Sequence, residues 1–467
     1  MNQRRGPSDF SGRHVHLMGI GGAGVSALVP LLQKSGAAVS GCDVDESPVV
    51  RRLRAHGFRV GIGHSPSHLD GVDIVVHTGA IAADHPELAR ARAEGIEVLT
   101  RAACLVRLMA GRRTLAVAGS HGKSSTTWML GHLLAEAGAD PVVMVGGSVA
   151  ALGGTGARAG GSDLFVAETD ESDGSFAQVQ PEVAVVTNLD HEHLRHYGSF
   201  TALEDAFGEW LSRVPRHGAV VVPATGLGPR VAANVSARLI RVGLDGGDYH
   251  AVDLDLGGEG SRCRVRGYGD DLGELVVPIP GAHMVHNALM AVAAAKAVRP
   301  EVKIAAMARC ERVRRRFTVH GKPKGVRVVE DYGHHPAEVR ATIGAARLGG
   351  GRVHVIFQPH RYTRTQDCFD DFTAAFDQAH AVVVLPIYAA SEQPIPGVDH
   401  ASLAHAIAGR RSGLGEERAL VKAFDDWDAA VDLMVRNAKP GDTCLVLGAG
   451  DVGQLAPLLV ERLEAQQ

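Results

Sequence analysis

Residues 114–127, TLAVAGSHGKSSTT, show most clearly how the chain folds. Thr114–Ala118 is a short apolar run typical of a buried strand, and Trp128–Gly138 has a helical pattern. Between them Gly122-Lys123-Ser124 forms the core of a phosphate-binding loop, in which backbone amides and the lysine hold phosphates and the hydroxyl reaches Mg²⁺. Val117 stands where the common GxxxxGK[ST] pattern has glycine, so the loop is a shortened variant, GxxGKS. Strand, loop and helix in this order predict an α/β fold.

The strand–helix alternation continues on both sides of this loop. Three strands are predicted before it and three after it: His14–Met18, Ala37–Cys42, Val72–His77, Leu164–Ala167, Val183–Thr187 and Ala219–Val222. Residues 241–277 differ, because they are rich in glycine and alternate in the manner of antiparallel ribbons. An alanine-rich helix is predicted next, at Asn287–Val298. The alternation itself predicts parallel sheets with right-handed crossovers.

A third alternation begins after Arg314-Arg315-Arg316-Phe317, which we interpret as a joint. Its predicted strands and helices are Val326–Glu330, Pro336–Ala346, Val353–Phe357, Asp370–Gln378, Ala381–Leu385 and Thr443–Leu447. At roughly 150 residues per domain, a chain of this length holds about three domains. We therefore predict three α/β domains in series, over residues 1–109, 110–314 and 315–467.

The composition is that of a globular protein with no polyanionic partner. The 48 basic and 52 acidic residues give a net charge of −4, which does not favour nucleic acid or anionic membranes. Apolar residues make up 45% of the chain, yet no run approaches the ~18 residues of a membrane span. Six separated cysteines without CxxC, and no leader-like N-terminus, predict reduced thiols and a cytoplasmic protein. The 57 glycines suit phosphate loops, and the 24 histidines raise the question of a metal.

A second glycine-rich loop, residues 19–24, matches GxGxxG through Gly19, Gly21 and Gly24 after a predicted strand, with Asp43 nineteen residues further on. Such a loop brings backbone amides to a pyrophosphate at the start of a helix. A dinucleotide cofactor and another pyrophosphate ligand both fit the pattern, as does a turn that binds nothing. The motif recurs at residues 448–453, but the fourteen residues that follow are too few for a complete cofactor fold.

Acids and histidines follow two strands of the predicted middle domain. The first strand runs into residues 168–173, ETDESD, and carboxylates at the carboxyl end of such a strand are typical magnesium ligands. We expect Glu168 to bind Mg²⁺, whereas for Asp173 a solvated loop is an equal alternative. The second strand runs into residues 190–197, DHEHLRHY, which narrowly misses the zinc motif HExxH because Arg195 replaces the second histidine. We therefore favour a magnesium role for this cluster.

In the third predicted domain, polar residues again follow two strands, as DYGHHP at residues 331–336 and QPHRYTR at residues 358–364. The carboxyl edge of a parallel sheet is the usual ligand-binding edge. Arg361 and Arg364 have the chemistry to hold a carboxylate or to neutralise a transferring phosphoryl group. The alternative role for each arginine is to form an ion pair at the surface.

Together these motifs resemble those of the Mur ligases. GSHGKSSTT, ETDESDGSF, PGAHMVHNA, RRRF, DYGHHP, FQPHRYTRT, YAASEQPIPG and LGAGD occur in that family's order, over about residues 13–455. DYGHHP and FQPHRYTRT are most similar to the branch that adds the first amino acid. The resemblance implies an N-terminal Rossmann-like domain for a UDP-sugar, a central ATPase-like domain and a C-terminal Rossmann-like domain that closes over ATP with the amino acid.

The resemblance also implies roles for individual residues. The phosphate loop and ATP contacts are Gly119, Ser120, His121, Gly122, Lys123, Ser124, Ser125, Asn287, Arg316 and Asp331. The magnesium ligands are Ser124, Glu168 and His193. The UDP-sugar contacts are Gly19, Gly21, Gly22, Gly24, Asp43, His64 and Thr78. The alanine contacts are His334, His360, Arg361 and Arg364; of these His334, Arg361 and Arg364, together with Lys123, are the expected catalytic residues.

The chain departs from the family pattern at a few positions. Met284 replaces an asparagine near the adenine, and Arg195 replaces an acid near the metal. Thr169 and Gly333 are milder changes, where family members usually have alanine. No departure removes a required chemical group, although Arg195 alters the local charge.

The implied chemistry is ligation of L-alanine to the carboxylate of UDP-N-acetylmuramate in peptidoglycan precursor synthesis, with ATP and Mg²⁺ as cofactors. ATP first converts the carboxylate to an acyl phosphate, and the amine then displaces phosphate; His334 is the expected base. Three alternatives stay open: a recycling ligase that adds a whole peptide, an NAD(P)-dependent dehydrogenase, and a nucleotide-regulated binding protein. Monomer and homodimer are both compatible with the sequence.

Overall fold

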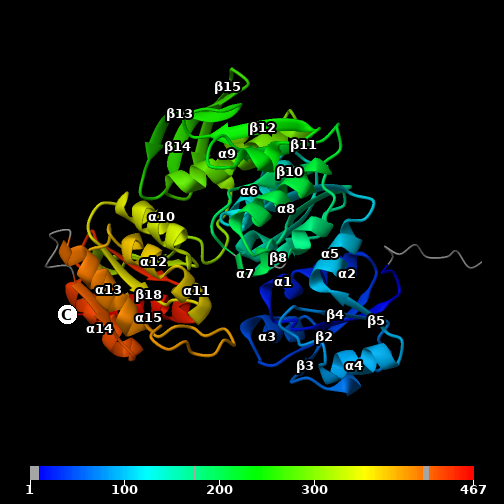
Figure 1. Cartoon of the computed structure of the whole chain (residues 1–467), viewed down its shortest axis with the longest axis horizontal. Helices are drawn as coiled ribbons and strands as arrows, with labels where there is room; N and C mark the ends of the chain where they lie inside the picture. The colour runs from blue at the N-terminus through cyan, green and yellow to red at the C-terminus, as the bar shows by residue number, and fades with distance from the viewer. Residues whose placement is uncertain (1–9, 173, 193, 414–419, 467) are drawn as a thin grey trace, which may run out of the picture. The chain divides into compact units, whose positions relative to one another are not determined.

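Three β-sheets organise the chain (Figure 1). The computed structural model describes residues 10–172, 174–192, 194–413 and 420–466. Their contacts group into two compact units. The first comprises the chain up to residue 252 together with 265–273 and 286–313, and the second comprises 253–264, 274–285 and the chain from 314 onward. The parallel α/β character predicted from the alternation is confirmed.

The first sheet has the strand order β3-β2-β1-β4-β5, and all its pairings are parallel. Its strands are β1 (His14–Met18), β2 (Ala38–Asp43), β3 (Arg59–Ile62), β4 (Ile74–His77) and β5 (Glu97–Thr100). Its helices are α1 (Ala23–Ser26), α2 (Leu28–Lys34), α3 (Pro48–Ala55), η1 (Pro66–Leu69), α4 (Pro86–Ala93) and α5 (Arg101–Met109). The strand order reverses beside β1, which is where such sheets bind ligands.

The second sheet has ten strands, in the order β15-β14-β13-β12-β11-β10-β6-β9-β7-β8. They are β6 (Arg113–Ala118), β7 (Val142–Val149), β8 (Thr155–Arg158), β9 (Leu164–Glu168), β10 (Val183–Val186), β11 (Ala219–Pro223), β12 (Arg238–Gly243), β13 (Tyr249–Leu256), β14 (Ser261–Gly267) and β15 (Asp270–Val277). The helices include α6 (Lys123–Glu136), α7 (Leu194–Tyr197), α8 (Phe200–Ser212) and α9 (Ala282–Val298). Strand β6 pairs in parallel with β9 on one side and with β10 on the other. The phosphate loop after β6 therefore lies between the two acidic segments predicted to share its site.

The third sheet has the order β16-β17-β21-β18-β19-β20. Its strands are β16 (Thr318–Gly321), β17 (Arg327–Asp331), β18 (Val353–Phe357), β19 (Ala381–Val384), β20 (Leu420–Ala423) and β21 (Thr443–Leu447). Its helices are α10 (Pro336–Arg347), α11 (Tyr362–Asp367), α12 (Phe369–Ala375), α13 (His400–Gly413), α14 (Trp427–Asn437) and α15 (Leu455–Ala465). Only the edge strand β16 pairs antiparallel, and β21 lies between β17 and β18. The segments after β17, β18 and β21 consequently share one edge.

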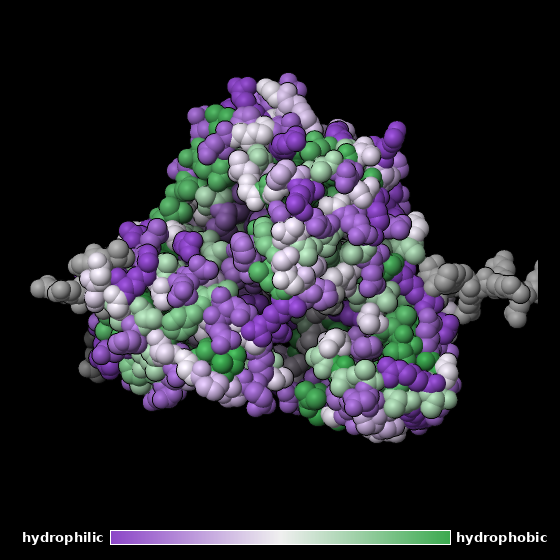
Figure 2. All heavy atoms as spheres, viewed as in Figure 1, coloured by the Kyte–Doolittle hydropathy of each residue, from purple (hydrophilic) through white to green (hydrophobic). Residues whose placement is uncertain are grey.

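One apolar cluster extends through the first two sheets, and the first sheet also has a smaller cluster that includes Met18 and Val75. Leu17 and Leu28 belong to the same buried cluster as Phe165 and Trp210, and α1 packs against β7 and β8. The third sheet has a core of its own, with residues such as Val446 and Leu459. On the face shown in Figure 2, hydrophilic and hydrophobic residues are interspersed. Among the described residues, no helix is long and apolar enough to cross a membrane.

Candidate active site

The phosphate loop turns tightly between β6 and α6. Gly119 and Gly122 have φ angles of +124° and +80°, in the region that favours glycine. A Cβ atom on Gly122 would lie 2.7 Å from Oδ1 of Asn287, which places this predicted adenine-side residue against the loop. Helix α6 begins at Lys123, five residues before the predicted start, because Ser124 and Ser125 already form its buried first turn. The loop amides and the start of α6 thus form one anion-binding turn.

The end of β10 holds this loop in place. Asn188 Oδ1 accepts a hydrogen bond from the His121 amide at 2.9 Å, and its Nδ2 donates to the His121 carbonyl at 3.0 Å. The Thr187 hydroxyl donates to the same carbonyl at 2.6 Å. The His121 ring Nε2 lies 3.0 Å from Asp190 Oδ2. His121 and Asp190, which the sequence places in separate motifs, therefore form one network.

Lys123 is held by a buried carboxylate that sequence reasoning left without a role. Its Nζ donates to Glu171 Oε1 at 2.8 Å and to the Gly119 carbonyl at 2.6 Å, and the Glu171 side chain is 1% exposed. Burial alone would lower the pKa of Lys123, but the Glu171 and Asp170 carboxylates raise it above its ordinary value. Burial raises the pKa of Glu171 to about 7, against the opposing effect of Lys123. Lys123 is therefore a charged ammonium at neutral pH.

Oxygen donors gather beside this lysine. Glu168 ends β9 next to Val117 of β6, and its Oε2 accepts a 2.6 Å hydrogen bond from the Gly146 amide. Burial tends to raise the pKa of Asp170, but Lys123 and hydrogen bonds from Ser172 outweigh it and lower that pKa. The Ser124 hydroxyl lies in the first turn of α6. Carboxylate and hydroxyl oxygens in this position fit a magnesium ion. The predicted ligand His193, like Asp173, lies outside the described residues.

The first glycine loop is fixed by the strand next to it. The Cys42 carbonyl accepts hydrogen bonds from the amides of Gly19 and Ile20, at 2.9 and 3.1 Å. Asp43 Oδ2 accepts from the Gly21 amide at 2.7 Å, so this carboxylate orients its own loop. Gly19 has a φ of +76°, and a Cβ atom there would lie 2.7 Å from Thr78 Cγ2. The structure thus brings Gly19, Gly21, Asp43 and Thr78 together.

His64, the remaining residue predicted for the UDP-sugar side, faces a different group. Its Nδ1 lies 3.2 Å from Cys42 Sγ and 3.4 Å from Glu87 Oε2, within a buried polar cluster behind the loop. Its side chain is 15% exposed. The structure therefore gives His64 a set of protein partners that the sequence did not reveal.

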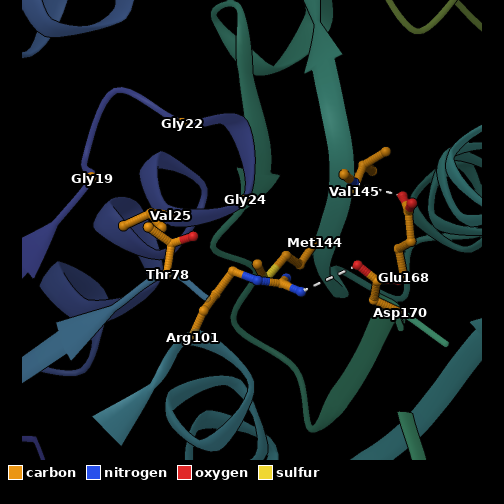
Figure 3. A pocket seen from close by; sticks show the side chains of 11 residues that line it. Gly19, Gly22, Gly24, Val25, Thr78, Arg101, Met144, Val145, Glu168 and Asp170 are labelled. Carbon is orange, nitrogen blue, oxygen red and sulfur yellow. Dashed lines mark hydrogen bonds and ion pairs between the residues drawn. The ribbon is translucent and has the colours of Figure 1, made fainter. Parts of the chain in front are cut away.

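A cavity of about 310 Å³ connects the glycine loop with the acidic edge of the second sheet (Figure 3). The part of the chain around the first sheet forms one wall, with Gly19, Gly22, Gly24, Val25, Thr78 and Arg101. The part around the second sheet forms the other wall, with Met144, Val145, Gly146, Glu168 and Asp170. Arg101 comes from the first turn of α5, and its Nη2 lies 3.9 Å from Asp170 Oδ2. A molecule held by the glycine loop would therefore reach the carboxylates beside Lys123.

The predicted alanine-end residues meet at the edge of the third sheet. The rings of His334 and His360 are 5.7 Å apart, and Arg364 Nη1 lies 3.4 Å from His360 Nδ1. The backbone of Arg361 has φ +72°, and its amide donates to the Tyr388 carbonyl at 2.8 Å. Burial, reinforced by His334 and Arg364, lowers the pKa of His360 to about 3. His360 is consequently neutral at physiological pH.

Asp331 and Arg316, predicted near ATP, have structural partners in this sheet. Asp331 is 6% exposed and accepts hydrogen bonds from the amides of Phe317 and Gly333, both at 2.7 Å. Burial raises the pKa of Asp331, with Arg316 and these amides opposing it. Arg316 Nη1 lies 3.5 Å from Glu338 Oε1. Both residues help to shape the turn that carries His334.

Arg315 is a further residue that sequence reasoning missed. Its Nη2 donates to the carbonyls of Gly448 and Gly450 at 2.6 and 2.9 Å, and its Nε lies 2.9 Å from Glu330 Oε1. Its guanidinium also lies over the Tyr332 ring, 4.9 Å from the centroid. Arg315 therefore joins the LGAGD loop to the DYGHHP strand. The run of arginines was the available signal, although it does not reveal which one turns inward.

Parallel sheets, a phosphate loop and an acidic edge together are typical of nucleotide-binding α/β enzymes. Models of one family match three successive parts of the chain. The Mur ligase family catalytic domain matches residues 14–113, the Mur ligase middle domain 117–295, and the Mur ligase glutamate ligase domain 315–450. The chain belongs to the Mur ligase family. Its three-domain architecture is the one predicted.

Within that family the chain is similar to the alanine-adding enzymes. A UDP-N-acetylmuramate–L-alanine ligase from Sorangium cellulosum is 44% identical, with 97% of both chains covered. One from Solibacter usitatus is 43% identical, over 98% of this chain and 97% of the relative. The crystal structure of the Thermotoga maritima UDP-N-acetylmuramate–alanine ligase matches with a TM-score of 0.81 and 26% identity, over 97% of this chain and all of that one. A murein peptide ligase from Psychrobacter arcticus shares the fold, with a TM-score of 0.69.

Proposed function

We propose that this protein joins L-alanine to the carboxylate of UDP-N-acetylmuramate, using ATP, in peptidoglycan precursor synthesis. The observation that carries the proposal is the cavity that runs from the glycine loop to Glu168 and Asp170. It allows a sugar nucleotide held at one end to present its acid group to a nucleotide held at the other. The sequence relatives named above support the choice of alanine and of the muramyl acid.

At the sugar-nucleotide end, the glycine-rich loop at residues 19–24 is suited to bind a diphosphate. The amides of residues 19–22 already donate within the protein, so the amides of Ala23 and Gly24 at the start of α1 are the groups we assign to the phosphates. Val44 and Ile62, at the ends of β2 and β3, are 62% and 45% exposed and offer an apolar flank to a nucleoside. Arg101 adds a cation at the cavity wall, where the muramyl carboxylate would pass.

At the triphosphate end, Lys123 and the loop amides are the groups we assign to the phosphates. Lys123 exchanges its bond with Glu171 for one with phosphate, or shares it between the two, and remains charged in both cases. The carboxylate of the sugar then attacks the terminal phosphorus, ADP leaves, and an acyl phosphate forms. Positioning and charge neutralisation are the main contributions of such a site to phosphoryl transfer.

We assign magnesium to the oxygen donors Ser124 and Glu168, together with His193 from the family resemblance. When bound, Mg²⁺ reduces the repulsion between the substrate carboxylate and the triphosphate. Glu168 is fixed for this role by the Gly146 amide, which leaves Oε1 available.

At the amino-acid end, we assign L-alanine to His334, His360, Arg361 and Arg364. The arginines suit the alanine carboxylate, since a guanidinium holds a carboxylate through two parallel hydrogen bonds. The amine must lose a proton before it attacks the acyl phosphate, and His334 is the base we propose. Its Nδ1 lies 3.1 Å from the Tyr332 carbonyl and 3.3 Å from Glu338 Oε2, two groups that orient the ring.

The alternatives are less well supported. A dehydrogenase would leave the phosphate loop without a function, and Asp43 Oδ2 already accepts a hydrogen bond from the Gly21 amide, so only one carboxylate oxygen is left for a ribose. The recycling ligase shares most of the motifs, but its solved relative matches with a lower TM-score than the alanine ligase. A cytoplasmic location and a monomeric or dimeric state stay predictions from the sequence.

Phosphate release tests the proposal directly. With UDP-N-acetylmuramate, ATP and Mg²⁺ present, we expect release only when an amino acid is added, and most rapidly with L-alanine rather than glycine or L-serine. Release with a tripeptide but not with L-alanine would indicate the recycling ligase. Phosphate release that does not depend on the sugar nucleotide would refute both ligase assignments.

A matched pair of variants tests the acidic edge. Glu168→Gln should lower the rate of phosphate release by about a hundredfold, as expected for loss of an electrostatic partner of the transferring group. Asp163→Asn is the control, because this exposed acid lies immediately before the opposite end of the same strand. Equal rates in the two variants would contradict the magnesium assignment.

A further inference from the structure

Four potential metal ligands converge behind the first glycine loop. His16 lies on β1, Cys42 on β2, His68 in η1 and Glu87 in α4, and a ligand atom of each lies within 4.8 Å of those of the others. His16 is 2% exposed, whereas Cys42 and Glu87 are fully buried. None of the four has a part in the ligation chemistry proposed above.

Two distances from the Cys42 sulfur match tetrahedral zinc coordination, whereas His68 Nδ1 and Glu87 Oε1 lie at hydrogen-bond distance, 2.7 Å apart. Cys42 Sγ lies 3.4 Å from His16 Nε2 and 3.5 Å from Glu87 Oε2. Around a zinc ion with Zn–S of about 2.3 Å and Zn–N or Zn–O of about 2.0–2.1 Å, tetrahedral geometry separates such atoms by roughly 3.5 Å. The sulfur, a ring nitrogen and a carboxylate oxygen are therefore spaced as the edges of one coordination shell.

The surroundings of Glu87 also favour a cation. Its Oε1 accepts hydrogen bonds from His68 Nδ1 and from the Ser65 amide, both at 2.7 Å, and Oε2 lies 3.4 Å from His64 Nδ1. A fully buried carboxylate requires a compensating positive charge. His64 and the Ser65 amide would remain as outer partners that orient the carboxylate.

We propose that His16, Cys42, His68 and Glu87 form a structural zinc site in the first sheet. A set of one thiolate, two imidazoles and one carboxylate is typical of zinc, and four protein ligands are typical of a structural site. Cys42 loses its proton on binding, because a coordinating thiol is deprotonated.

The site would stabilise the glycine loop through the backbone of Cys42. The Cys42 carbonyl holds the amides of Gly19 and Ile20, and Asp43 follows directly. Zinc would cross-link β1, β2, η1 and α4 beneath this loop. The inference is independent of the ligase proposal, since loss of zinc without loss of phosphate release would leave the ligase assignment intact.

Metal binding to the full-length protein tests the site. After removal of metals with a chelator, we expect a single Zn²⁺ per chain to bind in the presence of millimolar Mg²⁺, which occupies sites built from oxygen donors. Co²⁺ should give an absorption band from thiolate-to-metal charge transfer, and Zn²⁺ should displace it. Bound zinc should also raise the melting temperature.

Variants test whether the Co²⁺ absorption band comes from these residues. Cys42→Ser should abolish it, and Glu87→Gln and His16→Gln should each weaken zinc binding at least about tenfold. Cys104→Ser is the control, because Cys104 is equally buried but lies in the apolar core. If Cys42→Ser does not fold, the other two variants decide the matter. No bound zinc in the parent, or an unchanged band in Cys42→Ser, would show that the cluster is only a hydrogen-bonded network.

Discussion

At the scale of single residues, the Lys123–Glu171 pair has the largest consequence for experiments. A phosphate-loop lysine is the obvious residue to replace, yet here it also neutralises a carboxylate that is 1% exposed. Removing one partner of a buried ion pair leaves the other without compensation. Loss of activity in a Lys123 variant will therefore combine lost catalysis with lost stability.

Lys123→Ala should lower phosphate release by about a hundredfold or more and destabilise the fold by on the order of 3 kcal/mol. Lys123→Ala/Glu171→Gln should recover most of the stability but none of the activity, because no buried charge is left unpaired. Denaturant unfolding and phosphate release measure the two effects separately. Binding of UDP-N-acetylmuramate should persist in both variants. Equal stability of the single and double variants would argue against the pair as a stabilising contact.

His360 gives a prediction for pH dependence. The ring faces His334, Arg361, Arg364 and Arg315, with Tyr388 stacked on it, and burial is the main cause of its lowered pKa of about 3. A histidine with so low a pKa gains a proton only well below pH 6, so it contributes no titration at neutral pH. His360→Gln should reduce kcat/KM for L-alanine by the same factor at every pH from about 6 to 9. If the ratio of the parent's kcat/KM to the variant's kcat/KM fell towards pH 6, the His360 ring would be shown to titrate.

At the scale of elements, we expect the two glycine loops to divide the substrate contacts between them. Gly19 follows β1 and Gly122 precedes α6, and both have φ angles near +80° with a neighbouring side chain 2.7 Å from the position of a Cβ atom. Alanine at either position costs about 1–2 kcal/mol in backbone strain and also displaces that neighbour. Each loop can therefore be perturbed without touching the other.

Gly19→Ala should raise KM for UDP-N-acetylmuramate about tenfold with little change in KM for ATP, and Gly122→Ala should do the reverse. Steady-state kinetics with each substrate varied in turn measures both constants. Gly111→Ala is the control for strain alone, because Gly111 has a φ of +75° with no atom within 4 Å of the added carbon. A rise in both constants in one variant would contradict the division.

Elements were most predictable where a short segment rich in apolar residues is almost wholly buried. The predicted strands His14–Met18, Val353–Phe357 and Thr443–Leu447 coincide with β1, β18 and β21, which are almost wholly buried. The short edge strands β3 and β5 were missed, because each has four residues that are only partly buried. The predicted helix Asp370–Gln378 begins almost at α12, but the preceding turn of α11 was not foreseen.

The site was predictable to the extent that its residues belong to local motifs. The glycine loops and Glu168 stand at strand ends and could be assigned from spacing. Glu171 and Arg315 could not be assigned from spacing. The partner of Glu171 lies 48 residues away in sequence, and the partner of Arg315 lies more than a hundred residues away. The same limit applies to Arg101 in the cavity wall, which belongs to no motif, whereas Thr78 was named from the family resemblance.

At the scale of the whole molecule, the division into two compact units with separate cores predicts separate unfolding. Leu459→Ala, in the core of the third sheet, should lower the stability of its own unit by about 3 kcal/mol and leave the other transition unchanged. UDP-N-acetylmuramate should raise only the unfolding temperature of the unit that contains the glycine loop at residues 19–24. Differential scanning calorimetry measures both. A single transition that both changes move together would show that the units unfold cooperatively.

The continuous cavity beside Arg101 has a consequence for inhibitor design. Its two walls belong to one compact unit with a shared apolar core, so a single small molecule has both subsites within reach. A diphosphate mimic joined by a short linker to a magnesium-chelating head would engage both ends at once, and the tether converts the second contact into an intramolecular one. Resistance would then require changes in a glycine turn or in Glu168, where we expect substitution to lower the proposed ligase activity as well.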